Sequence, residues 1–197
     1  MRPIVTGALA LLLLPTSAPA SAATPAAAPA PLRIDANRST LAFQFTQAGA
    51  ATDGRFRRLS GSLQPAAANP GTLDVSIDVA SVDTGDAERD GLLRGPDLFD
   101  AKKQPLARFR VARLPAANAA GQVLLDGTLT LRGVSRALRI PAQLSITGSG
   151  AARSATLSGS TTLRRLDYGI GQGEWASTQW IANEVKVSFR LVLKAGP

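Results

Sequence analysis

Two residue types are missing from this chain of 197 residues, which contains neither cysteine nor histidine. Without cysteine no disulfide can form, so burial and hydrogen bonding must stabilise the fold even in an oxidising compartment. Without histidine the chain lacks the commonest general base and a common metal ligand. Ser-His-Asp, Cys-His and histidine-metal sites are therefore excluded, and we expect no catalytic residues, no metal and no cofactor.

The N-terminus has the pattern of an export signal. Met1 and Arg2 supply a short positive start, residues 4–14 form an apolar run, and Ala20 to Ala22 offer the small residues that a signal peptidase requires. The apolar run is shorter than the roughly 20 residues that a membrane-spanning helix needs. We expect residues 1–22 to be a cleaved signal peptide that directs the protein to the periplasm; the alternative is an uncleaved N-terminal anchor.

Residues 23–31 consist almost entirely of alanine and proline. Such a segment has nothing to bury, so we expect a disordered tether. The remaining residues, 32–197, are enough for one domain with a sizeable core.

Positive charge exceeds negative charge but is spread along the chain. The whole sequence has 22 Lys and Arg against 14 Asp and Glu, and removing residues 1–22 takes away only Arg2. No block of basic residues with interleaved aromatics occurs, so we expect no binding to nucleic acid. The charge suits an anionic membrane surface or an anionic lipid head group, and ordinary solvated charge is the alternative.

Apolar and polar residues alternate along most of the domain. In residues 72–79, apolar residues at odd positions alternate with mostly polar residues at even positions, which is typical of a half-buried strand. The same alternation predicts further strands within residues 41–45, 53–64, 107–111, 125–131, 138–146, 157–163 and 185–193. About eight strands with short connections predict an all-β sandwich or barrel. Residues 86–93 follow Thr84-Gly85 and carry acids at their start, which predicts one short helix in a long connection.

Closing the sheet into an antiparallel barrel would remove its exposed edges. An eight-stranded barrel can be filled by side chains or can hold one small ligand, and alternation alone leaves both open. The inward side chains are apolar, so only an apolar ligand would suit such a lining. The expected cavity residues are Phe43, Phe45, Phe56, Val75, Ile77, Val79, Phe99, Phe109, Val111, Leu129, Leu131, Ile140, Leu144, Leu163, Trp175, Val187 and Phe189.

Five segments resemble the motifs of the YceI-like proteins, in order and in spacing. Residues 83–90 resemble their D-T-G…R-D stretch, and residues 97–109 resemble D-F-F-D…P…F. Residues 127–134 resemble G-x-L-T-[LI]-x-G-V, and residues 165–175 resemble R-x-D-[FY]-G-[IV]-G-x-G-E-W. Residues 183–187 fit the family's final strand.

This resemblance implies a single lipocalin-like, eight-stranded β-barrel with one short helix in a long loop. It also implies an exported protein that holds a polyisoprenoid, either an isoprenoid quinone or a prenyl pyrophosphate, for transport, storage or sequestration. A homodimer would suit such a barrel, although no sequence pattern marks its surface. The family often has histidine where this chain has Leu92 and Gln47, so no histidine contact to a head group carries over.

Three groups of residues allow more than one interpretation. Asp83, Arg89, Asp90, Asp97 and Asp100 cluster around the expected helix, where they suit helix capping and ion pairs better than acid-base catalysis.

Arg164 and Arg165 are adjacent on an expected strand, so one of them should point inward. There it could meet an anionic head group, or pair with Asp167 or Glu174. Trp175 and Trp180 could cap the barrel or pack at a strand end. An enzyme acting on an isoprenoid or quinone, or a filled barrel without ligand, remain the alternatives to a lipid carrier.

Overall fold

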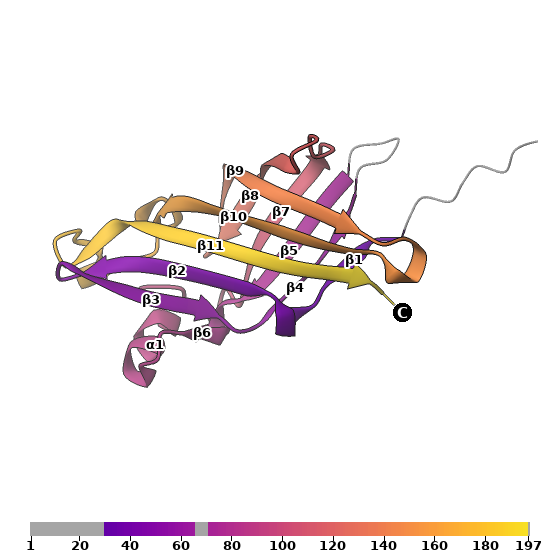
Figure 1. The fold of residues 1–197 in the computed structure, drawn as a ribbon. Helices are drawn as coiled ribbons and strands as arrows, with labels where there is room; N and C mark the ends of the chain where they lie inside the picture. The colour runs from indigo at the N-terminus through magenta and orange to yellow at the C-terminus, as the bar shows by residue number, and fades with distance from the viewer. Residues whose placement is uncertain (1–29, 66–70, 197) are drawn as a thin grey trace, which may run out of the picture.

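The computed structural model describes residues 30–65 and 71–196 (Figure 1). The expected signal peptide and residues 23–29 of the expected tether lie outside the described residues, so both stay predictions. Within the described residues, no helix is both long enough and apolar enough to cross a membrane.

The strands form one antiparallel sheet that closes on itself. They are β1 (Leu32–Ile34), β2 (Thr40–Gln47), β3 (Ala50–Phe56), β4 (Leu59–Gln64), β5 (Gly71–Asp78), β6 (Val82–Asp83), β7 (Leu106–Leu114), β8 (Gln122–Leu131), β9 (Val134–Thr147), β10 (Ser154–Arg164) and β11 (Ile181–Ala195). Strand β11 pairs with β10 on one side, and on its other side with β2 and then β1. Strand β1 pairs with β4, and the order continues through β5, β7, β8 and β9 back to β10.

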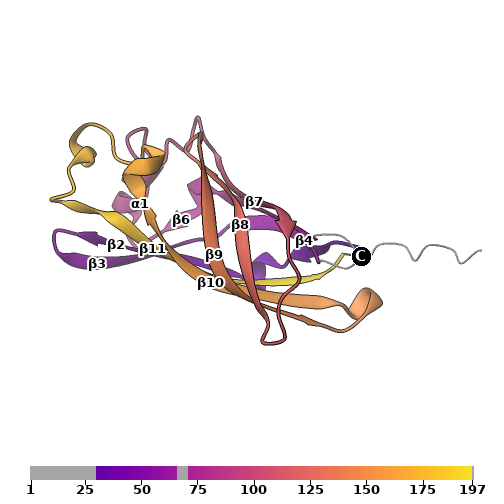
Figure 2. The ribbon, with the colours of Figure 1, turned by 90° about the horizontal axis from the view of Figure 1, so that it is seen from above.

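Three of the eight strands of the barrel are each broken into two segments, so the eleven strand segments form an eight-stranded barrel. The pairs β1 and β2, β3 and β4, and β5 and β6 each act as one long strand with a break. The predicted antiparallel, eight-stranded, lipocalin-like barrel is thereby confirmed. Figure 2 shows that the β2–β3 turn and the chain before β11 lie at one end of the barrel, with the C-terminus at the other.

The alternation seen in the sequence sets which side chains face inward. In β5, Leu73, Val75 and Ile77 are buried, whereas the residues between them, Asp74 and Ser76, are half-buried. This is the two-residue period of a strand that has one face in the core and one face in solvent.

The expected strand over residues 53–64 is wrong in one respect, because the chain breaks it at residues 57–58. Strand β3 pairs with β2 and β6, whereas β4 pairs with β1 and β5. Gly61 lies in β4 with a φ of +154°, and a Cβ there would collide with the backbone oxygen of Asp74. Glycine therefore lets β4 approach β5 closely while the sheet bends.

One α-helix, α1 (Ala87–Arg94), lies in the connection between β6 and β7, as the sequence predicted to within one residue. Asp86 is its N-cap, and the carboxylate of Asp86 accepts a hydrogen bond from the Arg89 N–H at 3.0 Å. This capping satisfies one of the N–H groups that a helix start leaves free.

The end of the barrel around β1 is filled by its own side chains. Leu32, Leu63, Leu114 and Leu193 are each at most 1% exposed there. Leu32 faces Leu63 across the β1–β4 pair, so the two strands bring these side chains together. This part of the barrel is a solid core, and any ligand must enter from the other end.

Candidate functional site

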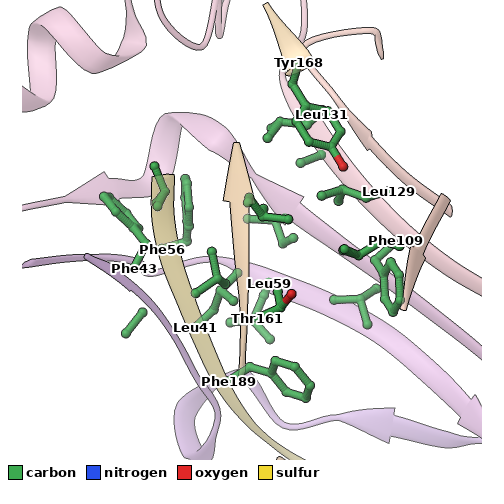
Figure 3. Close-up of a pocket in the computed structure, with 18 of the residues that line it drawn as sticks. Leu41, Phe43, Phe56, Leu59, Phe109, Leu129, Leu131, Thr161, Tyr168 and Phe189 are labelled. Atoms are coloured by element: carbon green, nitrogen blue, oxygen red, sulfur yellow. The ribbon is translucent and has the colours of Figure 1, made fainter. Parts of the chain in front are cut away.

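The other end of the barrel encloses an apolar cavity of about 190 Å³. Figure 3 shows lining side chains that project into one space from several strands, among them Phe109, Leu129, Thr161 and Phe189. Leu73, Leu125 and Leu157 also line the cavity and are at most 2% exposed, so they form its floor next to the solid core. The cavity therefore has a closed floor, and we infer that its mouth lies away from this floor.

The structure brings thirteen of the expected cavity residues to the wall of this cavity. They are Phe43, Phe45, Phe56, Val75, Ile77, Phe99, Phe109, Leu129, Leu131, Ile140, Leu163, Val187 and Phe189. The other four lie elsewhere: Val79, Val111 and Leu144 are buried in the packed core, and Trp175 packs half-buried against that core from a loop. These four residues therefore do not line this cavity.

Part of the inner wall stays accessible to water although it is apolar. Leu131, Leu163, Val185, Val187 and Phe189 line the cavity, yet each is only half-buried. Exposed apolar surface of this kind is costly unless something covers it, and it commonly marks a binding site.

Four phenylalanines form a connected cluster on one side of the cavity. The ring of Phe43 lies 6.2 Å from Phe45 and 5.3 Å from Phe56, and Phe56 lies 5.6 Å from Phe99. Gly54 stands opposite Phe43 in the β2–β3 pair, and a Cβ at Gly54 would collide with the Phe43 ring. Because Gly54 has no side chain, the Phe43 ring can pack against the backbone of β3.

Arg165 fixes the loop that connects β10 to β11. It is 4% exposed, and its Nε donates to the Ala182 carbonyl at 3.1 Å. Its Nη1 and Nη2 atoms donate to four more backbone carbonyls, those of Ile170, Trp175, Ser177 and Ile181, at 2.7–3.1 Å. All five N–H groups of the guanidinium are therefore used by the backbone, and burial lowers the pKa of Arg165.

Of the two alternatives that the sequence left open for an inward arginine, pairing with Asp167 or Glu174 does not occur at Arg165, which donates to backbone carbonyls instead. Strand β10 ends at Arg164, and Arg165 begins a short 3₁₀ helix instead of continuing the strand. Its guanidinium consequently lies among the carbonyls of the loop, and neither Asp167 nor Glu174 is its partner. A signal for this was available, because a glycine-rich stretch after the arginine predicts a loop with free carbonyls.

Other contacts tie three loops together beside the cavity. The Asp97 carbonyl accepts hydrogen bonds from Gly171 N and Gln172 N, both at 2.9 Å. Arg132, in the β8–β9 turn, donates from Nη2 to the Pro96 carbonyl at 2.7 Å. These bonds hold the segment after α1, the β8–β9 turn and the loop before β11 in one arrangement.

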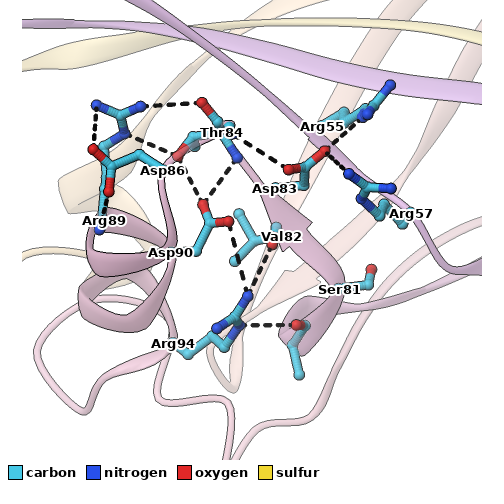
Figure 4. Close-up of polar contacts among 12 residues, drawn as sticks. Arg55, Arg57, Ser81, Val82, Asp83, Thr84, Asp86, Arg89, Asp90 and Arg94 are labelled. Atoms are coloured by element: carbon cyan, nitrogen blue, oxygen red, sulfur yellow. Dashed lines mark hydrogen bonds and ion pairs between the residues drawn. The ribbon is translucent and has the colours of Figure 1, made fainter.

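The charged cluster around α1 holds the helix in place (Figure 4). Asp83 forms ion pairs with Arg55 at 2.7 Å and Arg57 at 2.8 Å, and its hydrogen bond from Arg55 lowers the pKa of Asp83. Arg94 donates to the carbonyls of Ala80 and Val82. This supports the structural interpretation of the cluster, because its members bind one another and the backbone.

We expect Asp90→Ala to destabilise the protein by about 1–3 kcal/mol. Asp90 is 7% exposed, and its Oδ1 accepts from the N–H of Thr84 at 2.9 Å and from the Thr84 hydroxyl at 2.7 Å. Removing the carboxylate leaves both donors without this acceptor. Urea unfolding measures the change, and Glu88→Ala on the exposed side of α1 is the matched control. If Asp90→Ala and Glu88→Ala had equal free energies of unfolding, the hydrogen bonds from Thr84 to Asp90 would not stabilise the protein.

Several cavity residues escaped the sequence prediction. Leu41, Leu73, Leu125, Leu138, Leu157, Val185 and Leu191 also line the cavity, and they belong to the same alternating strands. Alternation shows that they face inward but not that they reach the hollow part. Leu93, Leu98, Tyr168 and Ile170 come from α1 and the loops, where no period marks the inward side.

The fold and the cavity together define a closed, lipocalin-like antiparallel barrel with one filled end and one hollow end. The model of the YceI-like domain family matches residues 32–193. This chain therefore belongs to the YceI-like family, and the resemblance inferred from the motifs is confirmed.

Individual relatives agree with this assignment. A UPF0312 protein of Pseudomonas aeruginosa is 37% identical over 122 residues, which cover 59% of this chain and 62% of the relative. The match thus spans about three fifths of that relative's length.

Solved structures show the same fold. BcnA of Burkholderia cenocepacia superposes with a TM-score of 0.72 at 30% identity, covering 81% of this chain and 98% of BcnA. A polyisoprenoid binding domain from Saccharophagus degradans, implicated in plant cell wall breakdown, gives 0.65 at 22% identity, covering 85% and 99%. At 22% identity, the similarity to the Saccharophagus degradans domain shows only that the two proteins share a fold.

Proposed function

We propose that this protein is an exported, non-enzymatic carrier that holds a polyisoprenoid lipid in its barrel for transport, storage or sequestration. The observation that carries the proposal is the half-buried apolar wall around the cavity, formed in part by Leu163, Val187 and Phe189. A prenyl chain laid against this wall would remove its apolar surface from water. Each buried methylene group contributes about 0.8 kcal/mol, so a five-carbon prenyl unit contributes roughly 4 kcal/mol before the costs of binding.

The cavity's size indicates how such a chain would lie. A dry apolar cavity of about 150 Å³ binds benzene. The enclosed space of about 190 Å³ would then take roughly one prenyl unit at the floor. Further units would run along the half-buried wall toward the mouth and displace side chains there.

The comparisons support a lipid ligand of this class. The polyisoprenoid binding domain of Saccharophagus degradans shares the fold of this chain. The excess of 22 basic over 14 acidic residues would favour exchange at an anionic membrane surface.

The proposal is tested by extracting the protein with organic solvent after purification from its native host and identifying the extract by mass spectrometry. We expect a prenyl lipid of defined chain length in near-stoichiometric amount. Protein in which Val187 is replaced by tryptophan is purified in parallel and should carry much less. An extract without prenyl lipid, from protein that also fails to bind added prenyl lipids, would refute the proposal.

A further inference from the structure

The end of the barrel that lies opposite the C-terminus has a tip without charged side chains. Two segments form it: residues 46–52, which include the β2–β3 turn, and residues 175–183, which lead into β11; neither contains Asp, Glu, Lys or Arg. The Ala48 N–H donates to the Trp180 carbonyl at 2.8 Å, so the two segments lie side by side, and Figure 2 shows both at the same end. Residues 46–52 and 175–183 together are called the neutral tip.

The neutral tip presents a tryptophan to solvent. Trp180 has the most exposed large apolar side chain of the described residues, with 67% of its surface accessible to water. Other exposed residues of the tip include Ala50, Ala51 and Ala176, which are small and uncharged. Apolar surface is costly in water, whereas an indole ring at a membrane–water interface has its apolar body in the lipid and its N–H near water. The Trp180 side chain therefore suits a bilayer interface better than bulk water.

The β2–β3 turn has an apolar residue at a position that favours a polar one. Ala48 has a φ of +48°, in the left-handed region, and Gly49 follows with a φ of +82°. Hairpin turns with two successive positive φ values usually begin with Asn or Asp, because those side chains tolerate this backbone conformation. Alanine lacks that advantage, so the turn gives up local stability and the tip stays free of charge and of a side-chain amide.

The neutral tip adjoins the cavity. Ile181, which belongs to the tip, lines the cavity and is 8% exposed, and Tyr168 and Ile170, earlier in the same connection, also line it. A prenyl lipid that moves between a bilayer and the cavity beside the tip would keep its chain in apolar surroundings for most of the way. Such a path avoids the cost of exposing the chain to water.

We propose that the neutral tip inserts into the interface of a phospholipid bilayer, with Trp180 as its anchor, and brings the cavity to the lipid surface. This inference rests on the proposed function, because a carrier of a membrane lipid collects or delivers its cargo at a bilayer. The contact is apolar and needs no anionic lipid, since the charged residues that directly flank the tip segments, Asp53, Glu174 and Glu184, are acidic. The excess of basic residues elsewhere acts on the approach to a membrane and not in this contact.

Sedimentation with neutral phosphatidylcholine vesicles tests the contact in the full chain and in three variants. We expect the wild type to bind, and Trp180→Ser and Ala48→Asp each to weaken binding roughly 5- to 20-fold. Because Asp tolerates a positive φ, Ala48→Asp should fold at least as well as the wild type, so its loss of binding would come from the added charge. Leu124 is 45% exposed near the start of β8, toward the other end of the barrel, and Leu124→Ser should bind like the wild type.

Fluorescence locates the anchor directly. The chain has two tryptophans, so Trp175→Phe leaves Trp180 as the only one. In this variant, neutral vesicles should shift the emission to shorter wavelength, and lipids with brominated acyl chains should quench it, because the indole leaves water for the interface. If vesicles sediment the protein but leave this emission unchanged, the contact lies elsewhere and the inference is overturned.

Prenyl-lipid binding in solution, measured on the same proteins, separates this inference from the proposed function. If the wild type binds a prenyl lipid but not neutral vesicles, the carrier function stands and the role of the neutral tip is overturned. If it binds neutral vesicles but no prenyl lipid, the bilayer contact stands and the carrier function fails. Binding that requires anionic lipid, or equal binding of the wild type, Trp180→Ser and Ala48→Asp, would also overturn the role of the tip. Circular dichroism melting of each variant checks that the fold is intact.

Discussion

Replacing Arg165 with methionine is expected to lower the free energy of unfolding by about 3–5 kcal/mol. The substitution keeps most of the apolar length of the side chain but removes all five N–H donors. The carbonyls of Ala182, Ile170 and Trp175, among others, then lose the buried guanidinium that they share. Urea unfolding measures the loss, and amide hydrogen exchange should rise selectively in residues 166–181.

Two further variants serve as controls for Arg165→Met. Arg164→Met alters the exposed neighbour at the end of β10 and should change stability by less than about 0.5 kcal/mol. Arg165→Lys keeps the charge but supplies three donors instead of five, so it should fall between the wild type and Arg165→Met. If Arg165→Met unfolds at the same urea concentration as Arg164→Met, the loop does not depend on this side chain.

Val187→Trp is expected to weaken prenyl-lipid binding at least tenfold while the barrel stays folded. Val187 lies in the middle of the half-buried wall, and the larger indole would occupy space that the proposed ligand needs. Because this wall is not fully packed, the added ring should cost less than it would in a solid core, where overpacking costs about 1–3 kcal/mol.

Ser188→Trp is the matched control for the Val187 variant. Ser188 is the next residue of β11, so its side chain points to the outer face, and it is exposed. Binding of the prenyl lipid to Ser188→Trp should equal its binding to the wild type within about twofold, measured by displacement of a fluorescent lipid dye. Equal binding to both tryptophan variants would place the lipid outside the cavity.

The strands and their inward faces could be predicted because burial imposes a two-residue period on a half-solvated sheet. The same period could not separate hollow from solid parts. Phe109 and Val111 lie on one face of β7, yet Phe109 lines the cavity and Val111 is in the packed core. The difference depends on how far along the barrel axis each residue lies, which the pairing of all the strands decides.

The loops were harder to predict than the strands for a related reason. Strand β1 has only three residues, too few to show alternation. The sequence places Arg164 and Arg165 together on one strand, whereas β10 ends at Arg164 and a 3₁₀ helix begins at Arg165. The alternation therefore could not show that the Arg165 guanidinium binds the carbonyls of the following loop. Tyr168 was not singled out, because its position against the cavity depends on this turn of the backbone and on no periodic signal.

A crystal structure of the protein loaded with a prenyl lipid would test the proposed cavity most directly. We expect the prenyl chain to lie inside the barrel, with its end near Leu125 and Leu157 and its flank against Val187 and Phe189. A lipid bound on the outer face, or a lumen filled by its own side chains with no lipid inside, would contradict it.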